Sequence, residues 1–233
     1  MRAECVTLAA DSDRSAGNWV GVTAGTAAVL DGGGSWAEGC ADLLGCAVLG
    51  RLADPSLTIE SCLPGAEREV RGVRGIVPGT PGTPGARGGS RRRPAAAFVR
   101  VVGREVEWLV IGDTVVVLDL PDGLRVASDG TDATAASDGT DGTGTGRASA
   151  ANWPVSGRVA LRKVRQVAML SSGAARLVTF GVVVWEQVMD TLAKDGPHVL
   201  VDEVRAFETL DPRCVRWPRS GVTADATVVH VRF

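Results

Sequence analysis

Three apolar, β-branched runs joined by very short connections dominate the middle of this chain. They span residues 96–102, 106–111 and 115–120, and glycine-containing triplets at 103–105 and 112–114 join them. Runs of this length that are rich in valine and bounded by turn residues are typical of β-strands. Connections this short join antiparallel neighbours, because a parallel crossover needs roughly a dozen residues or more. The chain is therefore constrained to contain an antiparallel meander.

Blocks of helix-type and strand-type sequence surround this meander. We expect a strand at 26–30, a helix opened by the capping-box pattern Ser35-Trp36-Ala37-Glu38, and a second helix from about Ser56. Pro64-Gly65 is expected to interrupt the second helix. These blocks favour an α+β arrangement, with helices layered on antiparallel sheets, over alternating βαβ units. The remaining expected elements are a strand at 166–170, helices at 183–194 and 197–210, and a closing strand at 226–233.

Two low-complexity stretches interrupt the patterned sequence. Residues 76–94 contain Pro-Gly-Thr repeats and an arginine run, and residues 128–150 repeat Ser-Asp-Gly-Thr-Asp within a tract of glycine, threonine and alanine. Such compositions bury too little apolar area to offset the entropy of ordering the chain, so we expect flexible insertions. Apart from these insertions, residues 1–233 are expected to form a single domain.

Composition argues against several classes of function. The chain holds 25 basic and 27 acidic residues, so we expect neither non-specific nucleic-acid binding nor binding to an anionic membrane. No apolar run reaches the roughly 18 residues needed to span a bilayer, and the N-terminus lacks a basic-then-apolar signal, so we expect a cytoplasmic protein. The five cysteines contain no Cys-x-x-Cys pair and fit neither a disulfide framework nor a zinc site.

Short acidic or hydroxyl-bearing motifs lie at the edges of several apolar runs. They are Asp31-Gly32, Gly112-Asp113, Ser171-Ser172-Gly173 and Ala224-Asp225-Ala226-Thr227. In order and spacing they resemble the metal-dependent serine/threonine phosphatases of the protein phosphatase 2C (PPM) type, and they look closest to short, divergent actinobacterial members. The resemblance implies a four-layer α/β/β/α sandwich of two antiparallel sheets flanked by helices. The best-matching segments are residues 108–120, 167–173, 216–219 and 224–233.

The resemblance also implies a chemistry. Members of that family hold two Mn²⁺ or Mg²⁺ ions between the sheets with carboxylates and a backbone carbonyl, and the ions activate a bridging water that attacks phosphorus. Hard divalent cations prefer oxygen ligands. A metal pair lowers the pKa of the water and stabilises the attacking and leaving oxygens. A site that loses anionic ligands is weakened in both respects.

Compared position by position, the family's ligand set is incomplete in this chain. Asp31 and Gly32 keep the Asp-Gly pair, whereas Asn18, Ser172 and Ala224 stand where the resemblance implies carboxylates. One of the four acidic ligand positions is therefore retained. We expect the site to lack the anionic oxygen that a dinuclear cluster needs.

Asp225 is a candidate substitute ligand, because it follows Ala224 directly. Successive side chains of a strand point to opposite faces, so this substitution requires a bulge or a register slip. Asp113 belongs to a Gly-Asp turn, and we interpret it as a turn residue rather than a ligand.

Three hypotheses follow. The preferred one is a pseudophosphatase that has no metal cofactor and no catalytic residue. It would bind a phosphoprotein or another protein partner through the cleft beside Asp31 and Ser172, where the resemblance places the metal site. The second is an active phosphatase dependent on Mn²⁺ or Mg²⁺ that uses altered ligands such as Asp225, Asp11 or Asp13. The third is a structural or adaptor protein unrelated to phosphate.

Overall fold

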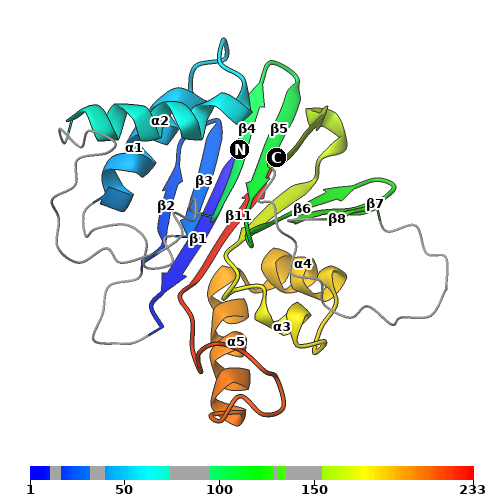
Figure 1. Ribbon diagram of the computed structural model, residues 1–233. Helices are drawn as coiled ribbons and strands as arrows, with labels where there is room; N and C mark the ends of the chain where they lie inside the picture. Colours follow the sequence, from blue (N-terminus) through cyan, green and yellow to red (C-terminus); the bar gives the residue numbers. More distant parts are fainter. Residues whose placement is uncertain (11–16, 32–39, 74–94, 129–130, 135–153) are drawn as a thin grey trace, which may run out of the picture.

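Two antiparallel sheets lie face to face, and helices cover the outer face of each sheet (Figure 1). The expected four-layer α/β/β/α sandwich is confirmed. The computed structural model describes residues 1–10, 17–31, 40–73, 95–128, 131–134 and 154–233.

The first sheet has six strands in the order β1-β11-β10-β6-β7-β8. The C-terminal strand pairs along its whole length with the N-terminal strand, from Arg2 opposite Arg232 to Leu8 opposite Ala226. Three helices cover the outer face of this sheet. The strands are β1 (Arg2–Leu8), β6 (Val115–Leu120), β7 (Gly123–Ser128), β8 (Thr131–Thr134), β10 (Gln166–Leu170) and β11 (Ala226–Arg232), and the helices are α3 (Arg176–Thr179), α4 (Trp185–Lys194) and α5 (Pro197–Leu210).

The second sheet has five strands in the order β2-β3-β4-β5-β9. Two helices cover its outer face, and a short 3₁₀ turn at Leu161–Lys163 leads from β9 towards the first sheet. The strands are β2 (Trp19–Val22), β3 (Thr26–Asp31), β4 (Ala95–Val102), β5 (Glu105–Ile111) and β9 (Val155–Ala160), and the helices are α1 (Cys40–Leu52) and α2 (Ile59–Val73).

The central strands are buried on both faces, which explains why they read as nearly continuous apolar runs. In β4, Ala97 and Val99 face the core between the sheets, whereas Ala96 and Phe98 pack beneath α1 and α2. The same alternation in β6 and β11 divides their side chains between the inter-sheet core and the core beneath α3, α4 and α5. Burying this apolar surface is the main favourable term that holds the four layers together.

Helix α2 differs from the sequence prediction. It runs through Pro64 without a break, although we expected an interruption there. Proline removes one intrahelical hydrogen bond, but the buried side chains Cys62, Leu63 and Ala66 hold the helix against the five-stranded sheet. Packing of this face outweighs the local cost of the proline.

Several expected features lie outside the described part of the chain. They include the capping box at 35–38, the first expected insertion at 76–94 and most of the second at 128–150. Within the second expected insertion, Thr131–Thr134 nevertheless forms β8, which pairs with β7. No helix among the described residues is both long and apolar enough to span a membrane.

Candidate functional site

The sequence motifs meet where the ends of the two sheets face each other. Asp31 ends β3 of the five-stranded sheet, and Ser172 follows β10 of the six-stranded sheet. The Ser172 hydroxyl donates a hydrogen bond to Asp31 Oδ2 over 3.2 Å. The expected proximity of these two positions is therefore present, and the bond joins the two sheets.

The serine motif also packs directly against the motif that opens β11. The Ser171 amide donates to the Thr227 carbonyl over 2.9 Å, and the Thr227 amide donates to Ser171 Oγ over 2.9 Å. A Cβ added at Gly173 would lie 2.2 Å from the carbonyl oxygen of Asp225 and 3.2 Å from the Cβ of Ala224. Only glycine permits this close backbone approach.

Asn18 lies in the same region with a neutral amide. It is 9% exposed, and its Nδ2 donates to Thr227 Oγ1 over 3.1 Å. Thr227 Oγ1 in turn donates to Thr7 Oγ1 over 3.2 Å. Asn18 Oδ1 is buried and accepts no hydrogen bond from the described residues. An aspartate at this position could not donate to Thr227, so the amide suits the hydroxyl network that surrounds it.

Asp225 is engaged by the backbone. Its Oδ1 accepts a hydrogen bond from the Ala10 amide over 2.7 Å, and its Oδ2 accepts one from the Gly17 amide over 2.5 Å. Ala10 and Gly17 flank residues 11–16, so one carboxylate connects both ends of that segment. Each oxygen of the Asp225 carboxylate therefore already accepts one backbone hydrogen bond.

Asp31 lies in surroundings that disfavour its charge. Burial raises the pKa of its carboxyl, and the nearby carboxylates of Asp113 and Asp225 raise the pKa further. The hydrogen bonds from Ser172 act in the opposite direction and lower the pKa. The net shift of the pKa is upward.

Asp31 is the one carboxylate that the described residues place at the four expected acidic ligand positions. Among the described residues, no group of three or more histidine, cysteine, aspartate or glutamate side chains is placed to hold a metal ion. Asp31 supplies carboxylate oxygen, Asn18 and Ser172 supply neutral atoms, and Ala224 supplies no side-chain donor. Gly32, Asp11 and Asp13, which the sequence also suggested, lie outside the described residues.

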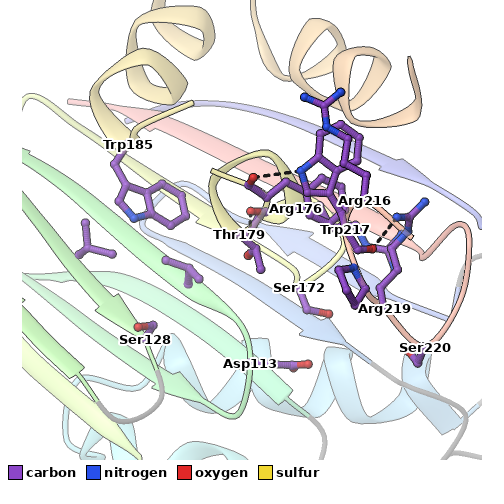
Figure 2. A pocket seen from close by; sticks show the side chains of 15 residues that line it. Asp113, Ser128, Ser172, Arg176, Thr179, Trp185, Arg216, Trp217, Arg219 and Ser220 are labelled. Carbon is purple, nitrogen blue, oxygen red and sulfur yellow. Dashed lines mark hydrogen bonds between the residues drawn. The ribbon is translucent and has the colours of Figure 1, made fainter. Parts of the chain in front are cut away.

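A cavity of about 790 Å³, the aromatic cavity, opens beside Ser172 between β6, β7, α3, α4 and the segment 216–220. Figure 2 shows Trp185 on one side of it and Trp217 on the other. Sequence reasoning missed this cavity, because no local pattern indicates that Trp185 lies near residues 216–220. Its lining also includes Asp113, Val115, Val126, Ser128, Ala175, Arg176, Thr179, Phe180, Arg216, Pro218, Arg219 and Ser220.

A buried aspartate organises the wall that carries Trp217. Asp211 is 6% exposed and accepts hydrogen bonds from the Trp217 amide over 3.0 Å and from Arg219 Nη1 over 2.8 Å. The amides of Val215 and Arg216 donate to the same carboxylate. Burial opposes ionisation of Asp211, but the Trp217 amide and the Arg219 guanidinium outweigh burial and lower the pKa to about 2.

Two of the three arginines that line the cavity are bound within the protein. Arg176 pairs with the fully buried Glu208 and donates to the Val222 carbonyl over 3.1 Å. Arg219 pairs with Asp211. Arg216 is exposed and lies over the Trp217 ring, with 4.6 Å between its guanidinium carbon and the ring centroid.

Comparisons with known proteins give a consistent picture of the fold. No protein-family model matches the sequence, and no curated protein matches it. Among solved structures, PppA, a key regulatory component of T6SS in Pseudomonas aeruginosa, aligns with a TM-score of 0.57 and 13% identity over 99% of this chain and 96% of that chain.

Two structures of serine/threonine phosphatases align with this chain at TM-scores similar to that of PppA. The serine/threonine phosphatase PstP/Ppp of Mycobacterium tuberculosis has a TM-score of 0.56 and 14% identity over 100% of this chain and 98% of its own. The catalytic domain of the serine threonine protein phosphatase PstP in complex with two manganese ions has a TM-score of 0.57 and 13% identity over 98% of this chain and 96% of its own. The chain therefore has the fold of the PPM-type serine/threonine phosphatases, as its ordered motifs predicted.

Proposed function

We propose that this chain is a pseudophosphatase, a PPM-type scaffold that serves a binding or regulatory role and no longer assembles the metal centre. The observation that carries this proposal is the set of hydrogen bonds formed by the residues at and beside the expected ligand positions. The Ser172 hydroxyl donates a hydrogen bond to Asp31, Asn18 joins a hydroxyl network through Thr227, and Asp225 accepts hydrogen bonds from two backbone amides. Asn18 and Ser172 thus form hydrogen bonds within the protein, at positions where the resemblance implies carboxylates that bind metal.

The charge balance supports the same proposal. Two divalent cations bring four positive charges, and oxygen ligands with negative charge are needed to offset the loss of their hydration. Asn18 and Ser172 contribute dipoles only, and Ala224 contributes nothing. A manganese-bound neighbour shows that this fold accommodates two ions when its ligands are present, so we place the difference in the ligands of this chain.

We propose that the partner is a protein, and that a phosphoprotein segment engages the cleft beside Asp31 and Ser172. The likeness to PppA, a regulatory component in its own system, supports a regulatory role. The balance of 25 basic and 27 acidic residues gives no reason to propose nucleic acid or an anionic membrane as the partner.

Calorimetric titration with Mn²⁺ tests the proposal on the purified chain. We expect no saturable heat for the native protein, and a measurable gain in affinity for the triple variant Asn18→Asp, Ser172→Asp, Ala224→Asp. Hydrolysis of p-nitrophenyl phosphate with Mn²⁺ is the parallel readout. Two manganese sites of about micromolar affinity in the native chain, together with Mn²⁺-dependent hydrolysis, would show instead an active enzyme with altered ligands.

Asp225→Asn separates the two outcomes further. If Asp225 is a substitute ligand, this variant loses any Mn²⁺ binding of the native chain, whereas in a pseudophosphatase it changes stability without changing metal affinity. The role of phosphate is tested by melting curves with phosphate or vanadate. No shift in Tm with either anion would favour an adaptor unrelated to phosphate.

A further inference from the structure

We propose that the aromatic cavity is a binding site for a small aromatic carboxylate. The cavity shares Ser172 with the cleft of the proposed function, but the inference requires neither a metal ion nor a phosphoprotein. Its volume of about 790 Å³ lies within the range of roughly 300–1,000 Å³ that is usual for small-molecule sites. The chemical class of the ligand follows from the side chains that line the cavity and from their charges.

The walls favour a planar, apolar ring. Trp185 lies across the cavity from Trp217 (Figure 2). Phe180 stacks on Trp217, and Val115 and Val126 of the sheet contribute aliphatic surface to the lining. A planar ring that packs against Trp185 gains apolar contact area and aromatic stacking.

The wall on the Trp217 side is already organised. The Phe180 and Trp217 rings stack with 5.1 Å between their centroids and 17° between their planes, and Trp217 Nε1 donates to the Phe180 carbonyl over 3.1 Å. Asp211 fixes the Trp217 backbone through its amide. A preorganised wall reduces the entropy lost when a ligand binds.

Arg216 supplies a cation that is available to a ligand. Arg176 and Arg219 are paired with Glu208 and Asp211. Among the described residues, the Arg216 side chain forms no ion pair with an acidic group and lies over the Trp217 ring. A guanidinium that stacks on an indole keeps the N–H donors at its edge free, and two of them match the two oxygens of a carboxylate.

The charges of Arg216 and Asp113 together favour a carboxylate ligand over a phosphate ligand. Asp113 is exposed and lines the same cavity. A single available guanidinium balances one negative charge, whereas the second charge of a phosphate monoester would face Asp113 without a partner. The site therefore suits a singly charged acid attached to an aromatic ring.

Calorimetry with 2-naphthoate as the probe, and with neutral 2-naphthamide as its matched control, tests the assignment. We expect saturable binding of one 2-naphthoate per chain, and binding of the amide at least about tenfold weaker, because the amide cannot pair with the guanidinium. Trp185→Leu should weaken both compounds, and Arg216→Gln should reduce the affinity for naphthoate to that for the amide. Arg213→Gln changes a neighbouring exposed arginine outside the cavity and should leave binding unchanged.

The experiment has clear contrary outcomes. Absence of saturable 2-naphthoate binding, equal affinity for the acid and the amide, or equal loss in the Arg216→Gln and Arg213→Gln variants would each overturn the proposal. Both arginines are exposed, so these variants are expected to fold, and thermal melts verify this. The manganese titration is read separately, so failure here leaves the proposed function untouched, and the reverse also holds.

Discussion

Two aspartates in this part of the molecule lie in opposite electrostatic surroundings. Asp31, between the sheets, is shielded from water and faces the charges of Asp113 and Asp225, and its pKa is raised. Asp211, beneath the wall of the aromatic cavity, accepts three backbone amides and pairs with Arg219, and its pKa is lowered to about 2. Backbone amides and a guanidinium that donate to Asp211 lower its pKa, although Asp211 is no more exposed to water than Asp31.

The contrast extends to the surroundings of each aspartate. Around Asp31 the ligand positions are engaged in neutral hydrogen bonds, and no basic side chain is among the causes of its pKa shift. Around Asp211 the charged groups are paired with one another, and they fix a loop that presents Arg216 and Trp217 beside the cavity. The first region consists of neutral hydrogen bonds around one carboxylate, and the second is a network of paired charges beneath the cavity wall.

The largest expected effect comes from breaking the ionic network beneath the cavity. Glu208 is fully buried and pairs with Arg176 and Arg205. Glu208→Gln removes the negative charge between two arginines, and should lower the free energy of unfolding by about 3–5 kcal/mol. Denaturant unfolding measures the loss. Glu203→Gln, the same change at an exposed position of α5, should have little effect, and an equal loss in both variants would contradict the assigned role.

Asp211→Asn should have the next largest effect. The native pKa of about 2 lies below the unfolded value of about 3.9, so this aspartate stabilises the fold fully above pH 4, and its contribution is lost as the pH falls towards 2. We expect the variant to melt at a lower temperature at neutral pH, and the difference in Tm to narrow between about pH 4 and pH 2. A difference that stays constant over this range would be inconsistent with a charged Asp211.

Asp31→Asn should change stability in the opposite direction. Because the folded pKa is raised, the unfolded chain releases this proton at lower pH, and the charged carboxylate destabilises the fold at neutral pH. Asparagine keeps an acceptor for the Ser172 hydroxyl, so the variant should have a higher Tm at pH 7. The advantage should disappear in acid, where the native carboxyl is protonated. A lower Tm at pH 7 would place a cation or further donors beside Asp31.

Ser172→Ala is expected to have the smallest effect. It removes the side-chain hydrogen bond that lowers the pKa of Asp31 and keeps the one from the backbone amide of residue 172, so the pKa should rise further while stability changes by about 1 kcal/mol or less. A ¹³C NMR titration of the Asp31 carboxyl measures this shift. Ser220→Ala, at an exposed position that also lines the cavity, is the matched control. An unchanged titration in Ser172→Ala would mean that the serine does not donate to Asp31.

The sequence predicts the interior of the sheets better than their edges. The expected strands at β3, β4, β5, β6, β10 and β11 are all present, and each has neighbours on both sides. The strands that we did not predict include β1, β8, β2 and β9, which form the four edges of the two sheets. An edge strand needs fewer apolar residues, so its pattern resembles a loop; β9, with alternating exposed residues, is an example.

The candidate site was also predicted only in part from the sequence. The family resemblance predicted that Asp31 and Ser172 would share one cleft. Asp31 ends β3 and Ser172 follows β10, and both strands are central in their sheets. Two facts could not be read from local patterns. Asp225 binds amides more than 200 residues away in the chain, and the aromatic cavity brings Trp185 beside residues 216–220. Both depend on how the layers pack, which local sequence patterns do not specify.

The central claim is that the positions around Asp31 lack the anionic oxygen needed to hold two metal ions. The most direct test is anomalous X-ray diffraction at the manganese edge, from crystals of the native chain grown with Mn²⁺. The account predicts no pair of manganese peaks between the ends of the two sheets beside Asp31. Two well-occupied ions there, coordinated by Asp31 or Asp225, would contradict it.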